Sequence, residues 1–131
     1  MRLRLSILTL ALTFGLAPLP AAANGWRSIH RYEKPSGACP GQEVLASFYA
    51  SGRRTANGER FDPNGDTAAA RDWPMGTVLT ITNPKNGESR TVRVNDLGPW
   101  GLSWKMGDKI DLARGAALRL GMTNSQYVCV E

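Results

Sequence analysis

Thr77-Val-Leu-Thr-Ile-Thr-Asn83 and Ser89-Arg-Thr-Val-Arg-Val94 are two runs rich in β-branched residues, and Pro84-Lys-Asn-Gly87 lies between them. Val and Thr fit the pleated, half-buried surface of a sheet, and Asn-Gly is a strong turn signal between two strands. This stretch therefore predicts a β-hairpin, and it makes the expected fold class mainly β.

Runs farther out along the chain extend this prediction. Val44–Tyr49 and Gln126–Val130 have the length and composition of strands, and Thr67–Ala70 is short and apolar. The segments between them are rich in Gly, Pro, Asn and Asp, as in Asp62-Pro-Asn-Gly-Asp66, which is typical of turns. Short strands joined by tight turns predict a small β-barrel.

One helix is predicted near the C-terminus. Leu112 to Leu120 is rich in Ala and Leu, Asp111 stands where an N-cap is wanted, and Gly121 supplies a stop. The turn-rich stretch Asn95-Asp-Leu-Gly-Pro-Trp-Gly101 is expected to be a loop.

The N-terminus has the pattern of a secretory signal peptide. Arg2 and Arg4 precede an uncharged run from Leu5 to Leu19, and Ala21-Ala-Ala23 offers a cleavage site. The run is shorter than the about 20 apolar residues of a membrane span. We expect removal of residues 1–23, a flexible lead-in over 24–41 and a barrel domain over 42–131. The product is expected to be a periplasmic or secreted monomer without a membrane anchor, and not a lipoprotein because no Cys lies near the cut.

The net charge of the chain and its few potential metal ligands limit the classes of function that fit the sequence. The formal net charge is +5, and Arg2 and Arg4 lie in the predicted signal peptide, so the rest carries about +3. This suits an anionic polymer such as the bacterial wall, whereas no Lys/Arg stripe interleaved with aromatic residues indicates nucleic acid. One His, His30, and two Cys make no cluster of metal ligands, so no metal or other cofactor is expected.

The two cysteines, Cys39 and Cys129, lie near opposite ends of the expected mature chain. In an oxidising compartment such a pair most simply forms one disulfide, and two free thiols are the alternative. The bond would close a loop of about 90 residues, which the loop-entropy model rates at about 4 to 5 kcal/mol.

Three carboxylates are the candidates for acid/base chemistry. Glu59 ends a polar loop, Asp96 follows a predicted strand, and Asp111 precedes the predicted helix. Each has a purely structural interpretation: Glu59 as a solvated side chain, Asp96 as a turn residue and Asp111 as a helix cap. Spacing alone leaves these alternatives open.

Six motifs follow one another between Val44 and Met122. They are Ala46-Ser-Phe-Tyr49, Arg54-Thr-Ala-Asn-Gly-Glu59, Asp66-Thr-Ala-Ala69, Trp73-Pro-Met-Gly76, Val92-Arg-Val-Asn-Asp-Leu-Gly-Pro99 and Ile110-Asp-Leu-Ala-Arg-Gly-Ala-Ala117. In this order they resemble the rare lipoprotein A (RlpA-like) family. The resemblance implies a six-stranded double-psi β-barrel related to expansins, membrane-bound lytic transglycosylase A and family 45 endoglucanases.

The resemblance also implies an activity on the glycan strands of peptidoglycan. Active members are endolytic transglycosylases that prefer glycan stripped of its stem peptides. Their functional Glu and Asp match Glu59 and Asp96, and the catalytic Asp of transglycosylase A barrels matches Asp111. The expected roles are Asp96 as acid/base, Glu59 as the second carboxylate and Asp111 as a charge that raises the pKa of Asp96; Glu59 and Asp96 could exchange roles.

Further candidates could bind the substrate. Tyr49, Trp100 and Trp104 could stack against sugar faces, or pack in the ordinary way. The candidates for hydrogen bonds to hydroxyl or acetamido groups are Asn57, Arg93 and Asn95.

The chain departs from the family pattern at two residues. Ala70 stands where the family usually has a functional His, and Leu97 stands where it usually has an Arg. The peptidoglycan-binding repeat domain of larger members is not seen after the barrel. These departures motivate an alternative function, a non-catalytic, expansin-like module that binds glycan or loosens the wall. A secreted factor that binds a partner protein is a third hypothesis.

Overall fold

The computed structural model describes Tyr32, Lys34, Pro35, Gly37 and residues 39–131. The predicted signal peptide, residues 1–23, and much of the predicted lead-in lie outside the described residues. No helix in the described part of the chain is long and apolar enough to span a membrane.

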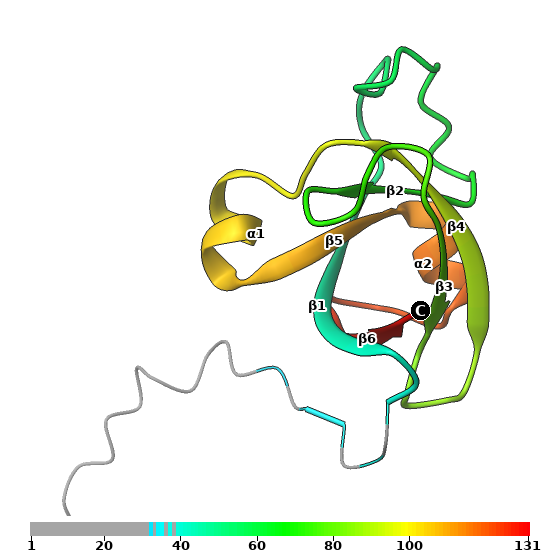
Figure 1. Cartoon of the computed structure of the whole chain (residues 1–131), viewed down its shortest axis with the longest axis vertical. Coiled ribbons are helices and arrows are strands. Elements are labelled where there is room, and N and C mark those ends of the chain that lie inside the picture. Colours follow the sequence, from blue (N-terminus) through cyan, green and yellow to red (C-terminus); the bar gives the residue numbers. More distant parts are fainter. Residues whose placement is uncertain (1–31, 33, 36, 38) are drawn as a thin grey trace, which may run out of the picture. The chain divides into compact units, whose positions relative to one another are not determined.

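Six strands form a closed barrel in the order β1-β5-β2-β4-β3-β6 (Figure 1). The strands are β1 (Gln42–Tyr49), β2 (Thr67–Ala70), β3 (Val78–Thr82), β4 (Ser89–Asp96), β5 (Asp108–Ala113) and β6 (Gln126–Val130). β1 pairs with β5 and β2 with β4 in parallel, and the other neighbouring pairs are antiparallel. The hairpin predicted from the alternating runs is confirmed as β3 and β4, which pair from Val78–Arg93 to Thr82–Ser89.

The barrel interior is filled by alternate residues of each strand. On β1, Val44 and Ala46 point inward, and on β2 the inward residues are Ala68 and Ala70. Small Ala side chains on β2 lie beside larger ones such as Ile110, the partner of Ala70 on β5, and together these residues belong to one buried core. Because side chains alternate along a strand, the intervening residues lie on the outer face of the barrel, where the candidate site is built.

In the described part of the chain two helices accompany the strands, and both differ from the prediction. α2 (Arg114–Arg119) is shorter than the predicted helix and has Ala113 as its N-cap. Asp111 is therefore not a helix cap, because it lies inside β5, where it pairs with Ser47. α1 (Gly101–Met106) begins at the end of the stretch expected to be only a loop, and Gly107, with φ 98°, closes it in a left-handed conformation.

The ends of the barrel domain are tied together. Cys39 and Cys129 form a disulfide with their Cα atoms 5.5 Å apart, which confirms the predicted bond. It joins the chain just ahead of β1 to β6. The connection from β1 to β2, residues 50–66, is the long green loop that projects at the top of Figure 1.

Candidate active site on the outer face of the barrel

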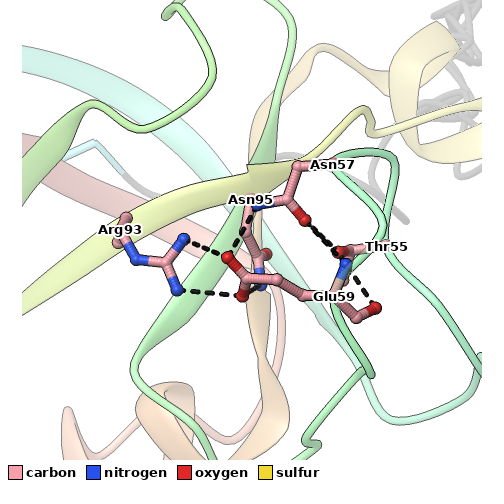
Figure 2. Close-up of polar contacts among 5 residues, drawn as sticks. All are labelled: Thr55, Asn57, Glu59, Arg93 and Asn95. Carbon is pink, nitrogen blue, oxygen red and sulfur yellow. Dashed lines mark hydrogen bonds and ion pairs between the residues drawn. The ribbon is translucent and has the colours of Figure 1, made fainter.

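Glu59 is held by three side chains from its own loop and from β4 (Figure 2). Both Nη atoms of Arg93 donate to its two carboxylate oxygens, at 2.6 and 2.9 Å. Asn57 Nδ2 donates to Oε1 at 2.7 Å, and Asn95 Nδ2 donates to Oε2 at 3.1 Å. These donors favour the charged form and lower the pKa of Glu59 to about 2. Glu59 is thus a fixed anion at any pH near neutrality.

The loop that carries Glu59 is itself a closed turn. Thr55 N–H donates to the Glu59 carbonyl at 2.9 Å, and Gly58 N–H donates to the Thr55 carbonyl at 2.9 Å. The Asn57 Oδ1 atom accepts from the Thr55 hydroxyl at 2.6 Å and from Glu59 N–H at 3.1 Å. The short Thr-Ala-Asn-Gly-Glu sequence therefore fixes the backbone of Glu59 by its own hydrogen bonds.

Asp96 faces outward because β4 contains a bulge. Val94 pairs with Ala68 and Asp96 pairs with Ala69, so Asn95 is an extra residue in β4. Paired residues lie on the same face of a sheet, and Ala69 faces away from the core-facing Ala68. The bulge thus turns Asp96 out of the barrel, as bulges beside active sites often do.

Three donors converge on the Asp96 carboxylate. The Tyr49 hydroxyl donates to Oδ2 at 3.1 Å, and the backbone N–H groups of Ala56 and Leu97 donate to Oδ1, each at 2.9 Å. Leu97 therefore reaches Asp96 through its backbone, whichever side chain it carries. Tyr49 is half-buried, and burial together with the charge of Asp96 raises the pKa of its hydroxyl, so that it remains a donor.

Asp111 and Asp96 lie on the same face, with strand β2 between them. Ala69 of β2 pairs with Asp96 on one side and with Asp111 on the other. Neighbouring strands are about 4.8 Å apart, so the two Asp residues stand about 10 Å apart at their Cα atoms. Asp96 and Asp111 therefore face outward on either side of one small residue.

The Asp111 carboxyl has a pKa that is raised towards neutrality. Burial raises its pKa to about 6, the Ser47 hydroxyl, which donates at 3.2 Å, opposes the shift, and the charges of Asp108 and Asp96 add to it. A carboxyl with such a pKa can both donate and accept a proton near neutral pH.

Asp108 and Ser47 are site residues that sequence reasoning missed. A second register shift, between Leu45 and Ala46 of β1, makes Lys109 the extra residue and places Asp108 opposite Leu45 on the outer face. Asp108 is only 3% exposed, and its Oδ1 atom has no hydrogen-bond partner among the described residues. Burial raises its pKa, and the hydroxyls of Ser103 and Ser47 oppose this shift. We call Asp96, Asp108 and Asp111 the carboxylate cluster.

Aromatic side chains lie beside this cluster. Trp100 is 60% exposed, and its Nε1 atom donates to the Leu97 carbonyl at 2.8 Å. The Arg71 guanidinium lies 4.4 Å from the centre of the Trp100 ring and 4.0 Å from that of Trp104. Lys109 lies 4.6 Å from the Trp104 ring. Trp100 is thus an exposed ring held in a fixed orientation, whereas Trp104 is packed against two cations.

Ala70, which stands where the family usually has a His, points into the barrel core. Ala70 is fully buried, belongs to the core and pairs with Ile110 of β5. Its methyl group therefore lies away from the outward-facing carboxylates and supplies no proton. Within the described residues, no three His, Cys, Asp or Glu side chains are arranged to hold a metal ion.

Residues 41–131, which include every element of this site, match the family model described as "Lytic transglycolase". The chain belongs to the lytic transglycolase family. This confirms the predicted resemblance and, with it, the double-psi β-barrel fold.

Two relatives of this lytic transglycolase domain carry the name RlpA. The chain is 49% identical over 86 residues to the probable endolytic peptidoglycan transglycosylase RlpA of Nostoc sp., which covers 62% of the chain and 22% of the relative. It is 44% identical to the endolytic peptidoglycan transglycosylase RlpA of Yersinia pestis, over 66% of the chain and 24% of the relative. The chain thus spans about a quarter of the length of these relatives.

A solved structure supports the fold alone. The Streptomyces papain inhibitor (SPI) superposes on the chain with a TM-score of 0.50 at 21% identity, covering 69% of this chain and 94% of the inhibitor. At this identity the likeness concerns the barrel and not its function.

Proposed function

We propose that this lytic transglycolase domain cleaves the glycan strands of peptidoglycan as a lytic transglycosylase. The bond broken is the β-1,4 bond between N-acetylmuramic acid and N-acetylglucosamine. The observation that carries the proposal is Asp111, a half-buried carboxyl with a pKa of about 6 on the same outer face as Asp96. The names of the RlpA relatives support the substrate. This substrate lies outside the cytoplasmic membrane, which agrees with the signal peptide predicted for residues 1–23.

Asp111 acts first as acid and then as base. Its proton passes to the glycosidic oxygen, and the bond from that oxygen to the anomeric carbon of the muramyl residue breaks. The resulting carboxylate then accepts the proton of the muramyl 6-hydroxyl, whose oxygen bonds to the anomeric carbon. The product has a 1,6-anhydro end, Asp111 regains its proton, and no water is consumed.

Asp96 supports the positive charge that develops on the sugar ring. Its three hydrogen-bond donors hold the carboxylate in place, so it is oriented before the substrate arrives. The proposed roles therefore differ from those expected from the sequence: Asp111 and not Asp96 carries the proton, and Asp96 and not Glu59 carries the stabilising charge.

Glu59 positions the site instead of transferring a proton. Its four hydrogen bonds keep it ionised, and through Asn95 it braces the bulge that turns Asp96 outward. Asn57 and Arg93, which were expected to bind sugar, therefore serve first to hold the Glu59 carboxylate. Trp100 remains a stacking surface for a saccharide, because its ring is exposed and fixed.

A second candidate is the glycan-binding module without catalysis. Ala70 favours it, because an Ala in the core replaces the His that the family usually carries at this position. The exposed Trp100 would serve such a module equally well.

Product analysis separates the two candidates. Glycan strands are digested with the wild-type protein and with Asp111→Asn, Asp96→Asn and Glu88→Gln, and 1,6-anhydromuramyl ends are counted by mass spectrometry. Glu88 is an exposed carboxylate in the turn between β3 and β4 and serves as the control. We expect products from the wild type and Glu88→Gln, and at least a hundredfold loss in both Asp variants. Binding of the strands without any anhydro product would support the non-catalytic module.

A further inference from the structure

An arginine-lined cavity opens in the projecting loop between β1 and β2. Its volume is about 750 Å³, within the range of small-molecule sites. It is lined by Gly52, Arg53, Arg54, Arg60 and Phe61. We call it the arginine pocket. A shallower hollow of about 410 Å³ continues from Arg60 and Phe61 to Asp62 and Pro63.

The walls of the arginine pocket are held in place by the backbone. Arg54 and Arg60 pair as an antiparallel bridge, and Phe61 N–H donates to the Arg53 carbonyl at 3.1 Å. The Arg54 Nη1 atom donates to the Gly58 carbonyl at 2.9 Å. The two arms of the loop are therefore fixed side by side, and the arginines line one cavity.

The positive charges of the pocket have no acidic partner among the residues that the structure describes. None of Arg53, Arg54 and Arg60 takes part in an ion pair with a described carboxylate, whereas Arg93 is paired with Glu59. The cavity is therefore lined by positive charge, and an anion entering it would be attracted to these guanidinium groups. Asp62 lies at the edge of the shallower hollow and accepts the N–H of Asn64 at 2.9 Å.

The arginine pocket adjoins the carboxylate cluster through one aromatic pair. Phe61, which lines the pocket, stacks on Tyr49 with ring centres 4.5 Å apart and planes 12° apart. Tyr49 in turn donates its hydroxyl to Asp96. A saccharide bound at Asp96 would therefore bring the substituents of neighbouring sugars to the pocket.

We infer that the arginine pocket binds a carboxylate carried by a muramyl residue of the glycan strand. The inference rests on the proposed function for its substrate. Every second sugar of the strand carries a lactyl group, whose acid is free in stripped strands and is joined to the stem peptide in intact strands. The same guanidinium groups suit the lactyl carboxylate or the carboxylates of the peptide, since both present a planar pair of oxygens.

Binding measurements test the inference independently of cleavage. In an Asp111→Asn background, which leaves strands intact, affinity is measured by calorimetry for stripped strands and for peptide-bearing strands. Each preparation is also tested after conversion of its carboxylates to methyl amides. The pocket variant is Arg53→Gln with Arg60→Gln. The matched control is Arg114→Gln, an exposed arginine at the start of α2. Thermal unfolding verifies that each variant is folded.

We expect amidation to weaken binding of at least one preparation roughly fivefold to tenfold, and the preparation affected identifies the lactyl or the peptide source. This difference disappears in the pocket variant and persists in Arg114→Gln. Equal affinity before and after amidation for both preparations, or an undiminished difference in the pocket variant, overturns the inference. If the Asp111→Asn protein discriminates but the wild-type protein gives no anhydro products, the proposed cleavage is overturned and the pocket stands. Cleavage by the wild-type protein without discrimination in the Asp111→Asn background would do the reverse.

Discussion

Replacing Asp111 by Asn is expected to make the protein more stable at neutral pH. The pKa of Asp111 rises from an ordinary 3.8 to about 6, chiefly because the folded protein buries the carboxyl. Below pH 3.8 the group is protonated in both the folded and the unfolded chain, and its burial costs no charge. As the pH rises through 6, the folded protein must hold a buried anion, so stability is lost. Asn removes that anion and keeps an oxygen for the Ser47 hydroxyl.

The size of the effect follows from the pKa. Each pKa unit corresponds to about 1.36 kcal/mol, so this rise corresponds to roughly 3 kcal/mol. Since the side chain is only half-buried, solvent screening reduces the expected gain to about 1 to 2 kcal/mol above pH 7. For a domain of this size that is a rise in Tm of roughly 5 to 10 °C.

Calorimetric unfolding of the wild type and Asp111→Asn between pH 4 and pH 8 measures the difference directly. The difference in Tm should be small at pH 4 and should grow through pH 6 to its full value above pH 7. Equal Tm values at pH 8, or a variant that is less stable there, would refute the idea that burial of the ionised Asp111 carboxyl destabilises the folded protein. A constant difference at every pH would show that packing, and not charge, is responsible.

Three more predictions follow from the site and its scaffold. The double variant Cys39→Ser with Cys129→Ser should lose about 2 to 5 kcal/mol in the free energy of unfolding measured in urea, because the disulfide closes a separation of 90 residues; an unchanged value would contradict this. Asp108→Asn should lower the pKa of Asp111 by less than one unit, measured by carbon NMR of the carboxyl, because it removes a like charge; a rise would contradict the proposed coupling. Trp100→Ala should raise KM for glycan strands about threefold to tenfold with little change in kcat, since it removes an exposed stacking surface; a selective loss of kcat would place Trp100 in the chemistry instead.

The sequence could predict the parts of the fold that depend on local patterns. Alternating β-branched residues and an Asn-Gly turn were enough for the hairpin of β3 and β4. The segment 108–113 was missed as a strand because Asp111 was interpreted as the N-cap of a helix beginning at Leu112. Its pairing is with β1 and β2, far away in the sequence, and no local pattern reveals such partners.

Three carboxylates of the candidate site were predictable from the sequence, but their roles and the two further residues Ser47 and Asp108 were not. Family motifs indicated Glu59, Asp96 and Asp111, yet the assignment of the proton to Asp111 needs the burial and the hydrogen bonds of the folded chain. The outward direction of Asp96 depends on a bulge at Asn95, which is visible only in the strand register. The arginine pocket was read as a polar loop, because the bridge from Arg54 to Arg60 is not encoded in a recognisable pattern.

The origin of the new chain end tests the central claim most directly. Glycan strands are digested with the wild-type protein in water enriched in ¹⁸O, and the muramyl ends are weighed by mass spectrometry. A lytic transglycosylase that uses the 6-hydroxyl as its nucleophile gives 1,6-anhydro ends that contain no ¹⁸O. Reducing ends that carry ¹⁸O would show hydrolysis by water and would contradict the proposed use of Asp111 as both acid and base.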